Sequence, residues 1–165
     1  VIYTQTPDRL FFNRMTKATT NEDLSVSSIT EVIDYMHQLQ EQSGVKVLIV
    51  GPLPPIAKNP KRFFQELSWK QPIKQQLYGL ISKHLLDLTR HVDVKFCELS
   101  KTADIPYISK IDAFEINLPS DLIVDGKLTY SDRRHLSAAG EKEFGARLVR
   151  RLCESGFREF CLLKN

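Results

Sequence analysis

The sequence predicts an α/β fold with an open, mostly parallel sheet flanked by helices. Two observations carry this prediction. Segments with helical spacing of apolar residues alternate with short β-prone segments, an order typical of parallel sheets with right-handed crossovers. Residues 45–50 are almost continuously apolar, as expected of a strand covered on both faces. With 165 residues, 42% of them hydrophobic, the chain has the size and composition of one globular domain.

The first predicted elements are a strand and a helix, separated by a long loop. Val1-Ile2-Tyr3 is β-prone and leads into the polar residues 4–27, which we expect to form the loop. Ser28-Ile29-Thr30-Glu31 has the spacing of a capping box, which predicts a helix start. Apolar residues then follow at helical spacing, and Gly44 suits a left-handed helix end. This helix should therefore run to about Ser43.

The middle of the chain predicts a strand, a helix and a second strand. Residues 45–50 form the expected central strand, and a Pro-rich stretch, 52–60, follows it. Pro72 can occupy the first turn of a helix. The apolar stripe of this helix consists of Ile73, Leu77, Leu80, Ile81, Leu85 and Leu88. Apolar and polar residues then alternate over 92–99, which predicts the second strand.

The last third of the chain combines a long irregular stretch with one predicted helix. Residues 100–131 show no sustained period, and such stretches in compact domains are usually functional or braced on the surface. Ser137 has the character of an N-cap, and apolar spacing continues a helix to Leu152. Residues 160–163 can add a short β segment.

Composition excludes several classes of protein. The formal charge of +3 is too small to favour binding to nucleic acid. The longest uninterrupted apolar run, Val47 to Val50, is far shorter than the ~20 residues that cross a bilayer. Cys97, Cys153 and Cys161 lack the paired spacing of a zinc site, so no metal is expected, and their odd number leaves the redox compartment open.

Catalytic chemistry is indicated by one of two copies of the pattern D-x-x-H. An Asp beside a His can hold the imidazole in the tautomer that takes a proton from a Ser hydroxyl. Asp132 and His135 lie in a predicted loop before a capped helix, where such a pair can serve catalysis. Asp34 and His37 lie inside a predicted amphipathic helix, where we expect a solvated polar pair.

The sequence around the second copy resembles a known enzyme superfamily. Residues 130–140 read Y-S-D-R-R-H-L-S-A-A-G, which looks like the last sequence block of the SGNH (GDSL-like) hydrolases. Two further segments, V-L-I-V-G-P-L-P at 47–54 and D-G-K at 125–127, resemble the SGNH module attached to membrane acyltransferases of the acyltransferase-3 family. The resemblance covers about residues 1–152.

The resemblance implies a function, a site and a location. It implies a three-layer, flavodoxin-like α/β domain that transfers an acetyl or acyl group to carbohydrate hydroxyls by a Ser-His-Asp mechanism, with Asp132 and His135 in catalytic roles. It implies no cofactor. The expected partners are an acyl donor, a carbohydrate acceptor and an upstream membrane acyltransferase domain, which would place the chain at the periplasmic side of a membrane.

The chain lacks other parts of the superfamily's chemistry. It contains no Gly-Asp-Ser, and none of its seven Gly residues begins a G-x-N sequence, so the nucleophile and the oxyanion donors are unmatched. We expect residues 1–165 to be the C-terminal portion of one SGNH-like domain, incomplete at its N-terminus, with the serine outside this chain. The alternatives are a carbohydrate or lipid esterase of the same superfamily, and a non-catalytic binding domain that kept the fold.

Other chemistry-bearing residues have plainer interpretations. His84 and His91 are expected at the surface or at helix ends. Basic residues near the last helix should serve solubility and the helix dipole, although one of them could meet an anionic glycan; they are Arg147, Arg150, Arg151 and Arg158. The aromatic residues Phe63, Phe64 and Trp69 could form a sugar platform, but core packing is the stronger expectation. No substrate-binding residue is predicted.

Overall fold

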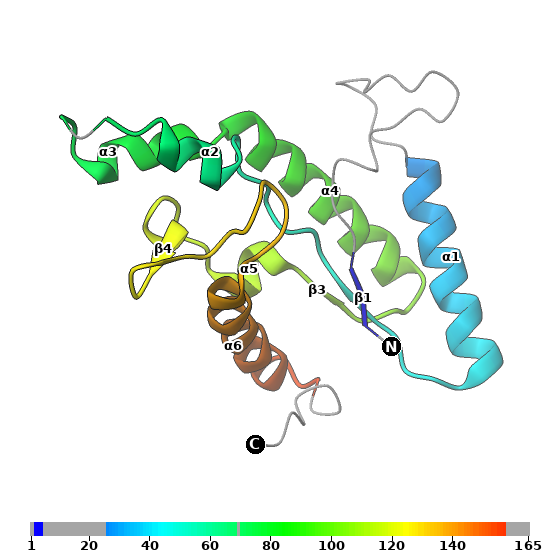
Figure 1. Cartoon of the computed structure of the whole chain (residues 1–165). Helices are drawn as coiled ribbons and strands as arrows, with labels where there is room; N and C mark the ends of the chain where they lie inside the picture. The colour runs from blue at the N-terminus through cyan, green and yellow to red at the C-terminus, as the bar shows by residue number, and fades with distance from the viewer. Residues whose placement is uncertain (1, 5–25, 69, 158–165) are drawn as a thin grey trace. The chain divides into compact units, whose positions relative to one another are not determined.

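The computed structural model describes residues 2–4, 26–68 and 70–157 (Figure 1). Two compact units make up the chain. The first consists of Val1–Leu53 and Asp87–Lys110, and the second of Pro54–Leu86 and Ile111–Asn165. Each unit therefore combines two separate stretches of sequence. The expected loop over 4–27 lies, apart from its ends, outside the described residues, as does the expected β segment at 160–163.

The first unit contains a three-stranded parallel sheet. Strand β2 (Leu48–Val50) lies between β1 (Ile2–Thr4) and β3 (Tyr107–Ile108). Both neighbouring pairs are parallel, with Ile49 of β2 opposite Tyr3 of β1 and Tyr107 of β3. All three residues of β2 are buried, which confirms the predicted central strand, although it begins three residues later than the apolar run.

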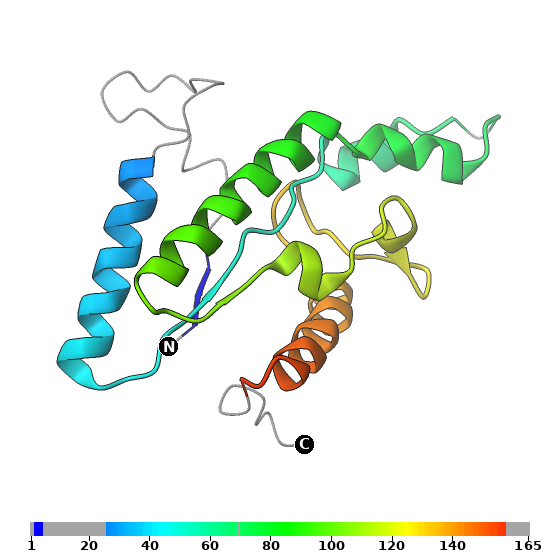
Figure 2. The same cartoon turned by 180° about the vertical axis from the view of Figure 1, so that it is seen from behind.

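Helices α1 (Val26–Ser43) and α4 (Lys83–Thr102) complete the core of the first unit. Figures 1 and 2 show the two helices side by side. The core cluster that they form with β2 and with residues just outside these elements comprises Ile29, Ile33, Met36, Val47, Ile49, Val92, Phe96 and Ile105. The end of α1 at Ser43 is confirmed, and Gly44 has the predicted left-handed backbone, with a φ of 64°. The predicted start is wrong, because α1 begins at Val26 and Ser28 lies inside its first turn.

The prediction of a strand over 92–99 is wrong, because this segment belongs to α4. Val92 and Phe96, four residues apart, are buried, whereas Val94 between them is 56% exposed. This burial follows the helical period of 3.6 residues and not the strand period of two. The apolar stripe predicted as one helix over 73–88 is divided among α3 (Ile73–Leu77), the 3-10 helix η2 (Tyr78–Leu80) and α4.

The second unit is built from short elements and one long helix. Helix α2 (Pro60–Gln65) begins at Asn59, whose side chain accepts hydrogen bonds from Lys61 N and Arg62 N. Further along the chain follow α5 (Lys110–Phe114), whose first residue belongs to the first unit, η3 (Ser120–Leu122), and an antiparallel hairpin of β4 (Ile123–Val124) and β5 (Lys127–Leu128). Helix α6 (Ala138–Glu154) packs against this hairpin.

The helix and strand content and the parallel sheet fit the predicted α/β class. The three-layer, flavodoxin-like arrangement stays a prediction, as does the assignment of residues 1–165 to part of one domain. Within the described ranges, no helix combines the length and the apolar character required to span a bilayer.

Candidate functional site

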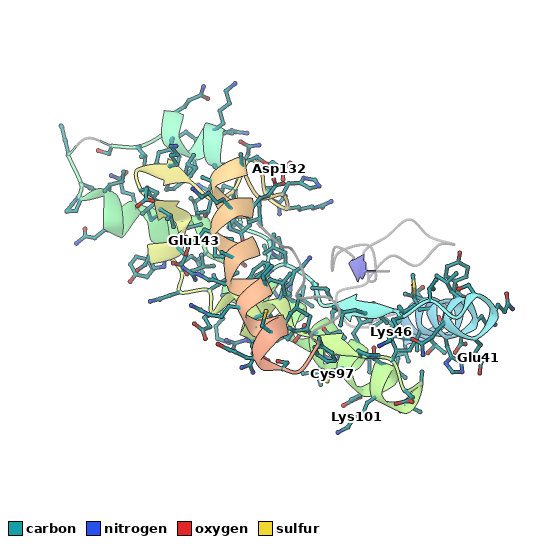
Figure 3. All side chains as sticks on the ribbon, turned by 90° about the horizontal axis from the view of Figure 1, so that it is seen from below. Glu41, Lys46, Cys97, Lys101, Asp132 and Glu143 are labelled. Atoms are coloured by element: carbon teal, nitrogen blue, oxygen red, sulfur yellow. The ribbon has the colours of Figure 1, made fainter. Side chains whose placement is uncertain are left out.

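The side chains of Asp132 and His135 are in direct contact. Oδ2 of Asp132 lies 2.7 Å from Nδ1 of His135. The other carboxylate oxygen, Oδ1, accepts hydrogen bonds from the backbone N–H groups of Arg134 (2.7 Å) and His135 (2.9 Å). In Figure 3, Asp132 lies beside the N-terminal end of α6. The loop thus holds the carboxylate through one oxygen and presents the other oxygen to the imidazole.

The hydrogen bonds around Asp132 determine which nitrogen of His135 carries the proton. The backbone N–H of Arg134 and the His135 side chain lower the pKa of the Asp132 carboxyl below its usual range. The carboxylate is therefore ionised at neutral pH, and an ionised carboxylate only accepts hydrogen bonds. Nδ1 of neutral His135 must then donate, which leaves the lone pair of Nε2 to act as a base. The His135 side chain is 69% exposed, so another molecule can approach it.

Backbone pairing closes the loop that carries the pair. Tyr130 and Leu136 form an antiparallel bridge, and Ser131 N donates to the carbonyl oxygen of His135 at 2.9 Å. The Ser131 hydroxyl donates to the carbonyl oxygens of His135 (3.2 Å) and Leu136 (3.1 Å). Asp132 and His135 therefore lie within a tight, five-residue turn, which explains their contact.

A second segment of the same unit anchors this turn. The hydroxyl of Tyr130, which is only 1% exposed, donates to the carbonyl oxygen of Pro54 at 2.8 Å. Ile56 N donates to the carbonyl oxygen of Arg133 at 2.9 Å. Burial, together with the charge of Asp121, raises the pKa of Tyr130, so its hydroxyl keeps the proton that it donates. The Pro-rich stretch after β2 thus supports the turn.

The start of α6 fixes the C-terminal side of the turn. Ser137 is the predicted N-cap: its hydroxyl accepts a hydrogen bond from Gly140 N at 3.1 Å and donates one to the carbonyl oxygen of Leu128. A Cβ atom at Gly140 would overlap the carbonyl oxygen of Thr129, so only glycine permits this close approach. The hydroxyls of Ser131 and Ser137 are both engaged by backbone groups.

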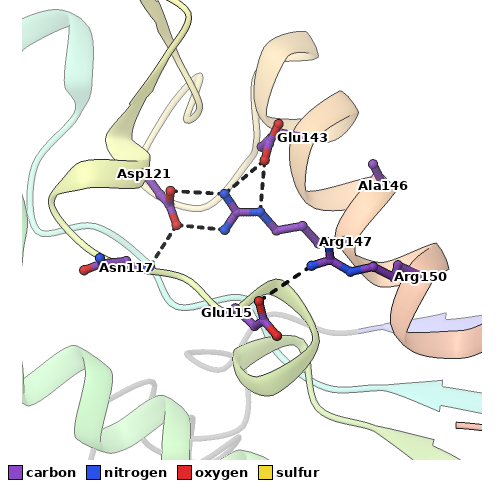
Figure 4. Close-up of a pocket in the computed structure, with 7 residues that line it drawn as sticks. All are labelled: Glu115, Asn117, Asp121, Glu143, Ala146, Arg147 and Arg150. Carbon is purple, nitrogen blue, oxygen red and sulfur yellow. Dashed lines mark hydrogen bonds and ion pairs between the residues drawn. The ribbon is translucent and has the colours of Figure 1, made fainter. Parts of the chain in front are cut away.

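An ion-pair cluster that the sequence did not indicate braces the adjacent hairpin. Arg147 of α6 lies 2.9 Å from Oδ2 of Asp121 and 3.0 Å from Oε1 of Glu143, and it donates to the carbonyl oxygen of Phe114 at 2.8 Å. Figure 4 shows this guanidinium between the two carboxylates. The cluster lines a cavity of about 500 Å³ together with Glu115 and Arg150. The only available signal was the i,i+4 spacing of Glu143 and Arg147.

Asp121 links the cluster to the turn that carries Asp132 and His135. Burial opposes ionisation of its carboxyl, but the hydrogen bonds from Arg147 and from the backbone of Asn117 prevail, and the pKa lies below its ordinary value. The carbonyl oxygen of Asp121 accepts a hydrogen bond of 2.6 Å from the Thr129 hydroxyl. Thr129 is fully buried and directly precedes Tyr130. Arg147 is thus a structural brace, a role beyond the predicted solubility and dipole roles.

The other predicted residues occupy different environments. His37 pairs with Glu41 at 3.4 Å, and no described contact joins it to Asp34, so the expected Asp34–His37 pair is wrong. His84 and His91 are exposed on α4, as expected. Phe63 is buried and packs edge to face on the half-buried Phe64, with ring centroids 5.4 Å apart, which confirms core packing for Phe63. Trp69 and Arg158 lie outside the described residues.

Comparisons with known proteins agree with the resemblance noted in the sequence. A family model for the SGNH domain fused to AT3 domains matches residues 3–150. The fold is similar to that of the periplasmic domain of a lipopolysaccharide acetyltransferase from Salmonella ser. Paratyphi A, with a TM-score of 0.56 and 20% identity. The match covers 95% of this chain and 56% of that one, so the chain spans little more than half of its structural neighbour. No curated protein matches the sequence.

Proposed function

Because the chain belongs to the family of SGNH domains fused to AT3 domains, we propose that it takes part in transferring an acetyl or other acyl group to a carbohydrate hydroxyl. The observation that carries this proposal is the 2.7 Å contact between Asp132 Oδ2 and His135 Nδ1. It lies within the sequence block that the resemblance assigns to the acid and base of the triad. The structural neighbour is a domain of a lipopolysaccharide acetyltransferase, which supports the choice of transfer.

In this proposal His135 is the general base and Asp132 is its positioning residue. Nε2 takes the proton of the serine hydroxyl while the serine oxygen attacks the acyl carbonyl, and then returns the proton to the leaving group of the donor. In the second half, Nε2 takes the proton of the sugar hydroxyl that attacks the acyl-serine and delivers it to the departing serine oxygen. The nucleophilic serine comes from outside these 165 residues, which contain no Gly-Asp-Ser.

We place this chemistry on the periplasmic side of a membrane, next to an acyltransferase domain of the same protein. The family is defined by fusion to AT3 domains. Cys153 of α6 forms a disulfide, and disulfides persist in oxidising compartments such as the periplasm. This disulfide supports an oxidising compartment, whereas the odd number of cysteines alone did not identify the compartment.

The test replaces His135 in the full-length protein. We expect His135→Ala to lower acyl transfer to the carbohydrate by about 10³-fold or more, because the variant loses the proposed general base for the serine proton. The matched control is His37→Ala, which removes the histidine of the other D-x-x-H and should leave transfer unchanged. Acylated carbohydrate is measured by mass spectrometry, and thermal unfolding reports whether each variant folds.

Two outcomes would contradict the proposal. If the folded His135→Ala protein still transfers acyl groups at the normal rate, His135 is not the base. If the unmodified protein releases free acid from the donor whether or not a carbohydrate is present, and acylates no hydroxyl, it is an esterase of the same superfamily.

A further inference from the structure

Positive charge is concentrated in one segment of the second unit. Residues 58–83, which we call the basic segment, contain six Lys or Arg residues and a single acidic residue, Glu66, for a formal charge of +5. The whole chain carries only +3, so the remaining residues together are slightly acidic. The basic residues are Lys58, Lys61, Arg62, Lys70, Lys74 and Lys83. Arg62 pairs with Glu66 at 2.9 Å, on the surface of α2.

The basic segment is folded and still exposes apolar side chains. Phe63, Leu77 and Leu80 are buried, and the Gln76 amide nitrogen donates to the carbonyl oxygens of Ser68 (2.7 Å) and Gln71 (2.9 Å). Outside this small core, Ile73 is 48% exposed and Tyr78 is 61% exposed (α3 and η2; Figure 1).

We infer that the basic segment docks on the surface of an anionic lipid bilayer. Exposed lysines attract acidic headgroups, and Tyr and Ile side chains next to them can enter the interfacial layer. Charge complementarity favours this partner, because the segment has a formal charge of +5 and bilayer headgroups can be acidic. The exposed apolar side chains favour a bilayer over a purely ionic partner, which offers no apolar layer for them to enter. Docking would hold the second unit, which carries Asp132 and His135, close to the membrane. It is independent of whether these two residues are catalytic.

Tryptophan fluorescence can report binding of the chain to lipid vesicles. Its only tryptophan, Trp69, belongs to the basic segment in sequence. We expect vesicles of phosphatidylcholine with phosphatidylglycerol to shift the tryptophan emission of the 165-residue chain to shorter wavelength. Brominated lipids in those vesicles should quench the emission. Vesicles of phosphatidylcholine alone should bind the chain much more weakly.

Paired variants distinguish this segment from general positive charge. Removing two lysines from it with Lys58→Gln and Lys61→Gln should weaken binding to the anionic vesicles by roughly 30-fold, at about 1 kcal/mol per cation. The matched control, Lys127→Gln with Lys142→Gln, removes the same charge from exposed sites elsewhere and should have little effect. Tyr78→Ser should weaken binding without changing charge.

Three results would overturn the inference. The first is an equal loss of binding in the two double variants. The second is vesicle binding that Tyr78→Ser leaves unchanged, since another surface would then make the contact. The third is a response to a soluble acidic polysaccharide as strong as the response to anionic vesicles, which would identify a glycan site in place of a bilayer site.

Discussion

The two D-x-x-H sequences differ in whether nearby backbone N–H groups are free to bind the Asp carboxylate. Asp34 and His37 lie within α1, where main-chain N–H groups are used by the helix, and His37 contacts Glu41 instead of Asp34. In the turn before α6, the N–H groups of Arg134 and His135 are available and hold one oxygen of Asp132. The same four-residue pattern therefore builds an Asp–His pair only where the backbone orients the carboxylate.

The largest expected difference between the two copies appears when the Asp of each is changed to Asn. Asp132→Asn should lower acyl transfer in the full-length protein by roughly 10²- to 10⁴-fold, because an amide can donate to Nδ1 and favour the wrong imidazole tautomer. Asp34→Asn should leave transfer unchanged. Steady-state transfer rates of the two variants are compared, and equal rates would show that the geometry of the turn has no catalytic role.

The next effect concerns the support of the turn by α6. Gly140→Ala should destabilise the 165-residue chain by about 1–3 kcal/mol or more, because its Cβ would overlap the Thr129 carbonyl. Gly145 of the same helix has open space around its Cβ position, so Gly145→Ala should stabilise the chain by up to about 1 kcal/mol. Denaturant unfolding measures both, and a destabilisation by Gly145→Ala as large as that by Gly140→Ala would contradict the role of close packing.

A smaller, pH-dependent effect tests the brace at Arg147. The pKa of Asp121 is lowered in the folded chain, so the stability it contributes is present above its ordinary pKa of 3.8 and is lost as the pH falls through the folded pKa. Asp121→Asn should therefore cost about 1–3 kcal/mol at pH 7. The difference from the unmodified chain should shrink below pH 3.8. A difference independent of pH would contradict this account of the ion pair.

Local chemical signals predicted some ends of elements correctly and others wrongly. Gly44 and Ser137 marked a helix end and a helix start correctly, since a left-handed backbone and an N-cap hydroxyl each require few residue types. The S-x-x-E at Ser28 failed because the same spacing also occurs inside a helix. The alternation over 92–99 failed as a strand signal because Asp93 faces the inside of the first unit. Its carboxylate accepts a hydrogen bond of 2.5 Å from the Tyr107 hydroxyl, whereas a strand would have turned it outward.

The candidate pair was predictable, but its supports were not. Asp132 and His135 lie three residues apart in sequence and share a recognisable block. The Tyr130–Pro54 and Arg147–Asp121 contacts join residues 76 and 26 positions apart, and no local pattern encodes such pairings. Long-range hydrogen bonds of this kind depend on how the chain folds back on itself, which explains why the brace was missed.

Nitrogen NMR of the histidine rings tests the central claim most directly, because it reports which ring nitrogen carries the proton. In the 165-residue chain at alkaline pH, where an imidazole ring is neutral, His135 should show a protonated Nδ1 and an unprotonated Nε2. Asp132→Asn should abolish this preference, and Asp34→Asn should not affect His135. A neutral His135 protonated at Nε2 in the unmodified chain would contradict the account, because the atom that we propose as the acceptor of the serine proton would already carry one.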